Sequence, residues 1–110
     1  ITGSISSAEG AVIHGIIRDL EDKRRKPNYS EEVLDIFQAD PKHLRSITII
    51  IDLYLKTVDG KEFFIELKGP DPNKKEVRAA KEDLLNIITI KKRDLTLLEF
   101  HKCVGVIFGV

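Results

Sequence analysis

The sequence predicts an α/β (α+β) domain whose mixed central β-sheet contains a β-hairpin and is flanked by helices. Residues 49–69 hold two apolar, alternating segments joined by Asp59-Gly60, a dipeptide typical of tight hairpin turns. Helical periodicity on both sides of this hairpin, and a last apolar run at 101–109, give the order helix, short helix, hairpin, helix, strand. Because a helix connects the hairpin to the last strand, we expect that step to be parallel and the sheet to be mixed.

Length and composition are those of one compact domain. The 110 residues are 42% hydrophobic, and 18 basic residues balance 18 acidic ones, which argues against a general DNA-coating protein. The single cysteine, Cys103, suits a reducing compartment, so we expect a cytoplasmic protein. No apolar run approaches the roughly 18 residues of a membrane span, so no membrane partner is expected. The chain lacks an initiator methionine and stops within the strand-like run FGV, so we expect it to be part of a longer protein.

Three helices are expected. The first covers residues 7–25, a short helix capped by Ser30 covers about 31–38, and a long helix covers about 73–92. The apolar stripe of the first helix consists of Val12, Ile13, Ile16, Ile17 and Leu20.

Glu9 lies near the middle of that stripe and has two interpretations. It follows Ser6 at the spacing of a capping box, which is a purely structural role. It is also a carboxylate on the buried side of the helix, where it could join a polar site on the sheet. Both roles are compatible.

The faces of the hairpin follow from strand alternation and register. Alternate side chains point to opposite faces, so Leu53 and Ile65 belong to an apolar face, and Asp52 and Glu66 to a polar one. A three-residue loop, with Gly60 in a left-handed conformation, pairs Leu53 with Ile65 and Asp52 with Glu66. This register keeps the apolar face continuous, and we expect that face to be the core face. The apolar positions are Ile47, Ile49, Ile51, Leu53, Leu55, Phe63, Ile65 and Leu67.

The same register places two carboxylates opposite each other on the polar face. Directly opposed like charges destabilise a sheet, so a positive group is needed between them. Lys68, two residues along from Glu66, supplies part of this charge. A Mg²⁺ ion would supply it better, because it takes carboxylate oxygens and keeps water ligands for a substrate.

Asp52, thirteen further residues and then Glu66-Leu67-Lys68 form a pattern that resembles the PD-(D/E)xK nuclease superfamily, most closely the catalytic core of a type II restriction endonuclease. The resemblance implies a restriction-endonuclease-like fold and a metal-dependent endonuclease that hydrolyses phosphodiester bonds of double-stranded DNA. It implies catalytic roles for Asp52, Glu66 and Lys68, and a Mg²⁺ site formed by Asp52, Glu66, the Leu67 carbonyl and Glu9. Ile51 stands where the family motif has a proline.

The resemblance also implies an organisation and partners. Residues 1–110 would be a single nuclease catalytic core, and the complete protein would act as a homodimer on DNA. In the long helix, Lys74, Arg78 and Lys81 follow one flank, which we expect to lie beside the nuclease site, where basic side chains suit DNA phosphates. The alternative is that these long side chains only cover the edge of the core.

Three other functions remain open. The chain could be a Holliday-junction resolvase or DNA-repair nuclease with the same core, or a nuclease-fold DNA-binding module without activity. It could also be a structural domain in which Asp52, Glu66 and Lys68 form only an ion-pair network. No cysteine and histidine spacing indicates zinc, and no glycine-rich phosphate loop is present.

Overall fold

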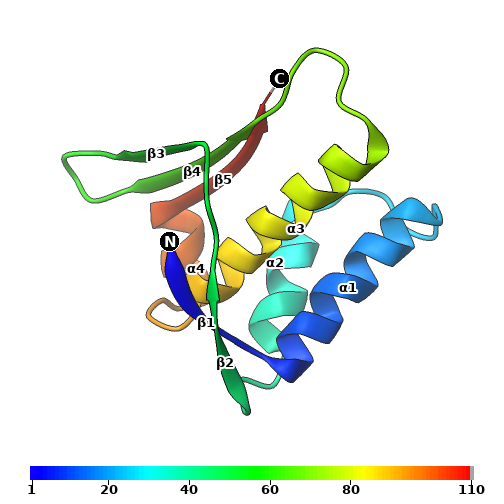
Figure 1. Ribbon diagram of the computed structural model, residues 1–110. Helices are drawn as coiled ribbons and strands as arrows, with labels where there is room; N and C mark the ends of the chain where they lie inside the picture. The colour runs from blue at the N-terminus through cyan, green and yellow to red at the C-terminus, as the bar shows by residue number, and fades with distance from the viewer. Residues whose placement is uncertain (110) are drawn as a thin grey trace.

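The computed structural model describes residues 1–109 and confirms the predicted fold class, a mixed α+β fold with two sheets and four helices (Figure 1). The elements follow the chain as β1 (Thr2–Ser6), α1 (Ser7–Glu21), α2 (Tyr29–Gln38), β2 (Leu44–Thr48), β3 (Leu53–Lys56), β4 (Glu62–Leu67), α3 (Lys74–Lys91), α4 (Leu97–Cys103) and β5 (Val104–Gly109).

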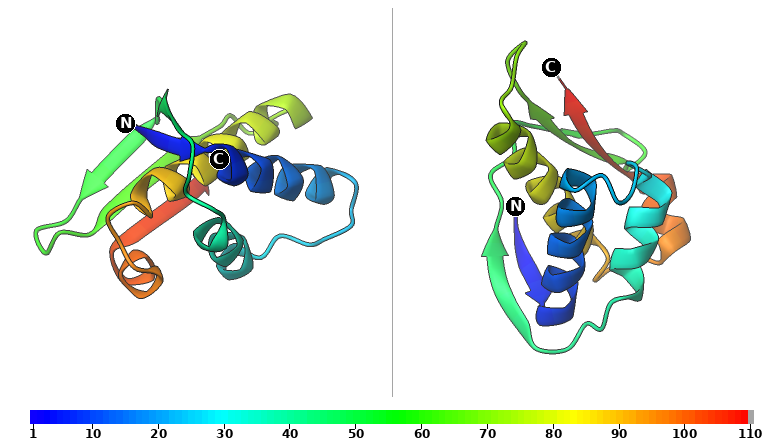
Figure 2. Two further views of the ribbon diagram at one scale, coloured as in Figure 1. Left: turned by 90° about the horizontal axis from the view of Figure 1, so that it is seen from below. Right: turned by 90° about the vertical axis from the view of Figure 1, so that its right-hand side faces the viewer.

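The strands form one small and one mixed sheet. β1 and β2 pair as an antiparallel two-stranded sheet. In the second sheet β3 pairs antiparallel with β4, and β4 pairs parallel with β5, which confirms the predicted parallel step. α3 occupies the middle of the molecule and contacts α1, α2, β1, β4 and β5 (Figures 1 and 2).

The hairpin has the predicted register. Leu53 pairs with Ile65, and the ladder ends at Lys56 and Glu62. Gly60 has a positive φ of 91°, as a left-handed residue at this turn position requires. The turn is closed by the Gly60 N–H, which donates to the Thr57 carbonyl at 3.0 Å.

The first strand of the predicted hairpin is not continuous, and this part of the prediction is wrong. Residues 44–48 form β2, which pairs with the N-terminal strand β1, an element that the sequence pattern did not indicate. Ile49 still exchanges backbone hydrogen bonds with Ile1, and the chain then bends at Asp52 before β3 starts the other sheet. One extended segment thus serves two sheets, and Asp52 lies in the bend between them.

The predicted core face of the hairpin is also wrong. Leu53, Leu55 and Leu67 are 39%, 48% and 50% exposed, whereas Phe64 and Glu66 on the opposite face are 2% and 3% exposed. The reason is that α3 packs on the Phe64 side of the sheet. We call the uncovered side the outer face; it consists of Leu53, Leu55, Phe63, Ile65, Leu67 and Ile107.

Several element ends also differ from expectation. α1 ends at Glu21, because Lys23 adopts a left-handed φ of 57° that stops the helix. α2 begins at Tyr29 and is capped by Asn28. The last strand begins at Val104, because Thr96 and Glu99 form a capping box that starts α4.

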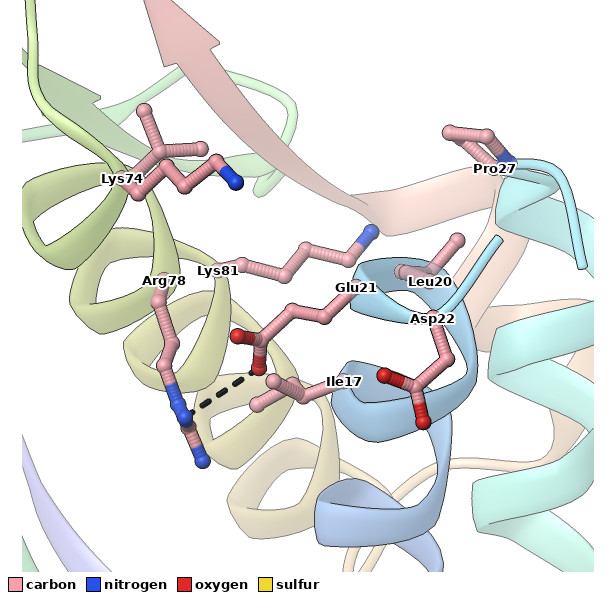
Figure 3. Close-up of a pocket in the computed structure, with 9 residues that line it drawn as sticks. Ile17, Leu20, Glu21, Asp22, Pro27, Lys74, Arg78 and Lys81 are labelled. Carbon is pink, nitrogen blue, oxygen red and sulfur yellow. Dashed lines mark ion pairs between the residues drawn. The ribbon is translucent and has the colours of Figure 1, made fainter. Parts of the chain in front are cut away.

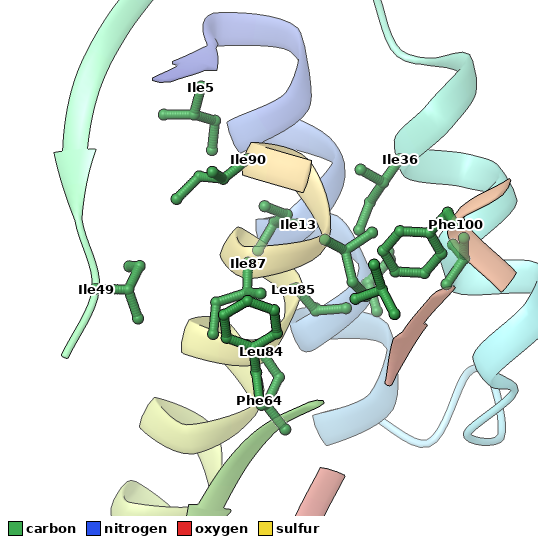
Figure 4. Close-up of a cluster of buried hydrophobic side chains, with 14 of the residues drawn as sticks. Ile5, Ile13, Ile36, Ile49, Phe64, Leu84, Leu85, Ile87, Ile90 and Phe100 are labelled. Carbon is green, nitrogen blue, oxygen red and sulfur yellow. The ribbon is translucent and has the colours of Figure 1, made fainter. Parts of the chain in front are cut away.

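The core lies between the three longer helices and the inner faces of both sheets. Figure 4 shows Leu84, Leu85 and Ile87 of α3 gathered with Ile13 of α1 and Phe64 of β4. Among the described residues, no helix is long and apolar enough to cross a membrane.

Candidate active site

Asp52 and Glu66 meet where the bend enters the mixed sheet. The Asp52 backbone N–H donates to Glu66 Oε1 at 3.3 Å, and the Leu67 backbone N–H donates to Asp52 Oδ2 at 2.7 Å. These two reciprocal hydrogen bonds confirm that the acids are neighbours, although Asp52 lies before the regular ladder and not within it. The bend therefore fixes both carboxylates beside the end of β4.

The two acids differ in their surroundings. Asp52 is exposed, whereas Glu66 is 3% exposed. Burial raises the pKa of Glu66, and the negative charges of Asp52 and Asp83 raise it further, against the hydrogen bond from Asp52 and the charge of Lys68. A buried carboxylate beside another acid is a group that a bound cation would stabilise.

Lys68 belongs to the same site. Its backbone N–H donates to the Gly109 carbonyl at 2.9 Å, which ties the end of β4 to the end of β5. Its side chain is half-buried, and its positive charge lowers the pKa of both Glu66 and Asp83. The lysine is therefore on the side of the acids, as the strand alternation predicted.

Asp83 of α3 is a fourth member of the site that the sequence reasoning missed. Burial raises its pKa, followed by the charge of Glu82, and Asp52 also raises it. The signal was present in the helix pattern, because Asp83 lies one turn before Ile87, which is fully buried. An acid at that position faces the sheet and not the solvent.

The donor atoms of this site fit a divalent cation. The Asp52 and Glu66 carboxylates and the Leu67 carbonyl offer hard oxygen atoms of the kind that Mg²⁺ prefers. Within residues 1–109, no three His, Cys, Asp or Glu side chains gather closely enough to hold a metal ion by themselves. The protein would therefore hold such an ion with few side chains and leave the remaining positions to water and substrate.

Glu9 does not join these acids, so the predicted cluster of three carboxylates is wrong. Its side chain accepts a hydrogen bond from the Ser6 N–H at 2.8 Å in the predicted capping box. It also pairs with Lys92 Nζ at 2.5 Å and with the Arg93 guanidinium, just past the end of α3. Asp83 lies near the middle of α3, ten residues or roughly 15 Å along the helix before Arg93, whereas the Glu9 cluster lies at the C-terminal end of α3.

The partners of Glu9 explain its ionisation. Burial raises its pKa, but the hydrogen bonds from Arg93, Lys92 and Ser6 outweigh that effect and lower the pKa to about 2. Glu9 is thus a structural residue that is charged at neutral pH, and both of its oxygens have partners.

The three basic residues proposed for DNA line a hollow of about 490 Å³ between α1 and α3 (Figure 3). Arg78 forms an ion pair with Glu21 at 3.2 Å, and Lys81 forms one with the buried Glu32 at 2.5 Å. Lys74 has no ion pair among residues 1–109.

The basic residues do not flank the acids as expected. With 3.6 residues per turn, Lys74, Arg78 and Lys81 lie roughly 140–180° around the axis of α3 from Asp83. They face α1 and α2, whereas Asp83 faces the site of Asp52 and Glu66. The three basic residues do share one flank of α3, as their spacing predicted. That flank is on the side of the helix opposite Asp83.

Comparison with known proteins gives the family of the chain. The family model described as "Type II restriction endonuclease, HinfI" matches residues 1–108. The chain is also 31% identical over 97 residues to the type II restriction enzyme HgiEI of Herpetosiphon aurantiacus, and 30% identical over 97 residues to HgiBI of the same organism. Each match covers 84% of this chain and 35% of the relative, so the chain spans about a third of the length of these curated relatives. No solved structure matches the chain. Because the family model covers almost every residue, the chain belongs to the HinfI family of type II restriction endonucleases.

Proposed function

We propose that residues 1–110 form the catalytic core of a type II restriction endonuclease of the PD-(D/E)xK superfamily, which hydrolyses phosphodiester bonds of double-stranded DNA with Mg²⁺. The observation that carries the proposal is the pair of reciprocal hydrogen bonds between the Asp52 and Glu66 segments, with Lys68 beside them. The family supports DNA cleavage as the activity, and the printed names of the relatives describe type II restriction enzymes.

Each residue has a distinct task in this proposal. Asp52, Glu66 and the Leu67 carbonyl hold the cation, which when bound neutralises phosphate charge and makes water more acidic. Lys68 orients the attacking water and offsets the negative charge that develops on the phosphate. The raised pKa of Glu66 supports its role. A bound cation would offset both the desolvation of the buried carboxylate and its repulsion by Asp52.

The proposal extends to partners. The complete protein would be a cytoplasmic homodimer on double-stranded DNA. Of the three basic residues on α3, Lys74 is the best candidate for a phosphate contact, because Arg78 and Lys81 are already paired with Glu21 and Glu32. The complete set of two acids and a lysine argues against an inactive DNA-binding module.

The test is charge removal at the site in the complete protein. We expect Asp52→Asn, Glu66→Gln and Lys68→Ala each to lower the DNA cleavage rate by about 100-fold or more, because each removes a group that acts on the transition state. Cleavage of plasmid DNA in the presence of Mg²⁺ measures this.

Glu62→Gln is the matched control. Glu62 lies on the same strand and the same face as Glu66, but it pairs with Lys91 at 2.6 Å and not with Asp52. Folded Glu62→Gln protein should keep the wild-type cleavage rate. Addition of Mg²⁺ without DNA should raise the melting temperature of the wild type and leave that of Glu66→Gln unchanged. Undiminished cleavage by Glu66→Gln protein would refute the assignment.

A further inference from the structure

The outer face of the mixed sheet is apolar at every position that carries a side chain. Leu53 and Leu55 come from β3, Phe63, Ile65 and Leu67 from β4, and Ile107 from β5. The remaining β5 positions on this face are glycines, at Gly105 and Gly109. A sheet face exposed to water normally alternates with polar residues, so this one has the composition of a core face.

The described residues do not cover that face. Leu55, Leu67 and Ile107 are 48%, 50% and 44% exposed, although they are neighbours on one surface. Figure 1 shows the helices below and to the right of the mixed sheet, on the side of its inner face. Proteins rarely leave a contiguous apolar patch larger than a few hundred Å² uncovered, so we expect a further segment to pack here in the complete protein.

The length of the relatives shows that residues outside this chain are available as a cover. The matched stretch spans only 35% of each curated relative, so most of such a protein lies outside residues 1–109. β5 ends at Gly109, which pairs with Leu67 at an outer-face position, and Figure 1 shows the C-terminal end of the chain at the end of this strand. Ile1, in contrast, lines a hollow with Tyr54 and Phe64 on the opposite face. The chain after residue 110 is therefore better placed to reach the outer face than any segment before Ile1.

We propose that the part of the protein C-terminal to residue 110 folds back onto the outer face and buries Leu53, Leu55, Leu67 and Ile107. The covering segment presents an apolar stripe, since the outer face offers no charged or hydrogen-bonding side chain to it.

The β5 side of the face suits close packing. A Cβ atom at Gly105 would lie 2.7 Å from the Phe63 ring, and one at Gly109 would lie 3.1 Å from Leu67 Cδ2. Phe63 and Leu67 therefore lie over the two glycines. Ile107 is the β5 side chain that projects from the outer face. Phe63 and Leu67 fill the space above the glycines, so a helix or strand laid along β5 would pack on these two side chains and on Ile107.

Photo-crosslinking in the complete protein tests the proposal. A p-benzoylphenylalanine side chain at Leu55 should, after irradiation, crosslink within one chain to a peptide C-terminal to residue 110, as identified by mass spectrometry. Tyr54 is the matched control position, because it is 44% exposed on the neighbouring residue but points to the opposite face. The same substitution at Tyr54 should not capture that peptide.

Other outcomes overturn the proposal. A crosslink between two chains would assign the outer face to a second copy, and a crosslink to a segment before Ile1 would assign it to the N-terminal part. Absence of any crosslink from folded protein would mean that the face is open.

Hydroxyl-radical footprinting of the unmodified complete protein gives an answer that does not depend on the folding of a variant. Leu55 and Leu44 are 48% and 54% exposed in the described residues, so they should react alike if the outer face is open. Under the proposal Leu55 reacts several-fold more slowly than Leu44, and equal rates contradict it. Neither measurement uses DNA cleavage, so failure here is separate from failure of the proposed function.

Discussion

Glu9 and Glu66 are both buried glutamates, yet their pKa values move in opposite directions. Glu9 is 0% exposed, and the hydrogen bonds and charges of Arg93 and Lys92 lower its pKa to about 2. Glu66 is 3% exposed, and burial together with the charge of Asp52 raises its pKa. Burial raises the pKa of both glutamates, so the difference in the direction of their shifts comes from their partners. One glutamate is therefore a structural anion, and the other is a group that gains from a cation.

Glu9→Gln should destabilise the protein. The substitution removes the anion that neutralises Lys92 and Arg93, and a buried ion pair that loses one partner costs about 3 kcal/mol. Because the folded pKa of Glu9 lies below the ordinary value of 4.5, this stability is present above pH 4.5 and is lost as the pH falls towards 2. Urea unfolding of both proteins at several pH values measures the difference. A variant as stable as the wild type at pH 7 would contradict the structural role.

Glu66 should give the opposite pH dependence. Its folded pKa lies above the ordinary value of 4.5, so the folded state without metal keeps a proton that the unfolded state releases. Stability should therefore decrease as the pH rises from 4.5 through the folded pKa, and Glu66→Gln should reduce this slope. Asp83 contributes with the same sign, so some slope remains in the variant. Unfolding curves between pH 4.5 and 7 in the presence of a chelator measure it. The same slope in wild type and variant would contradict this assignment.

At the scale of elements, local sequence patterns were sufficient to predict structure that depends on residues close together in the chain. The capping box and apolar stripe of α1 predicted that helix, helical periodicity predicted α2 and α3, and the turn at Gly60 predicted the register of the hairpin. Both depend on contacts within a few residues along the chain. The expected cap of α2, Ser30, was wrong, because Asn28 caps that helix.

The errors arose where distant segments compete for the same residues. The segment before Asp52 is apolar on alternate positions, which indicates a strand but not which sheet it joins. β1 pairs with it from a stretch of glycine and serines that carries no strand signal, although Ile5 is 1% exposed. The more apolar face of β4 was expected to be the core face. Instead, α3 covers the face that carries Phe64 and Glu66. That choice depends on the whole fold.

Gly3→Ala should show how closely β1 packs on α3. A Cβ atom at residue 3 would lie 2.4 Å from Ile90 Cγ2 and 3.1 Å from Ile90 Cβ, and Ile90 is buried, so its side chain cannot move aside freely. We expect a loss of about 1–3 kcal/mol from this overpacking. Gly15→Ala in α1 is the control, because no atom lies within 4 Å of the added Cβ, and it should stabilise by about 0.5–1 kcal/mol. Thermal unfolding measures both changes, and a neutral Gly3→Ala would mean that β1 packs more loosely.

For the molecule as a whole, the fold decides which charged side chains are paired and which are available to a partner. The chain has 18 basic and 18 acidic residues, and many of them are paired across elements, so sequence spacing alone does not show which cations are available to DNA. Glu66 and Lys68 share one face because strand alternation fixes it locally, and hydrogen bonds across the bend hold Asp52 beside Glu66. The pairing of Glu9 with Arg93 and that of Lys81 with Glu32 join residues 84 and 49 positions apart along the chain, so local patterns did not predict them.

The basic residues of α3 give the last prediction. Lys81→Ala leaves Glu32, which is 1% exposed, without its cation, and should destabilise the protein by about 2 kcal/mol, reduced because Lys81 itself is partly solvated. Lys74→Gln should change stability by less than about 0.5 kcal/mol, because Lys74 is exposed and has no ion pair among the described residues.

The DNA affinity of the complete protein should respond in the opposite order. If Lys74 contacts a phosphate, Lys74→Gln lowers the slope of log affinity against log salt concentration by about 1, because one fewer counterion is released. Lys75→Gln is the matched control, since Lys75 is the next residue and is also exposed but does not line the hollow of Figure 3. Fluorescence anisotropy with a DNA duplex over a range of salt concentrations, in Ca²⁺ to prevent cleavage, measures the slopes. Equal slopes for Lys74→Gln, Lys75→Gln and wild type would leave this flank of α3 with only a structural role, and phosphate contacts would then have to come from another surface.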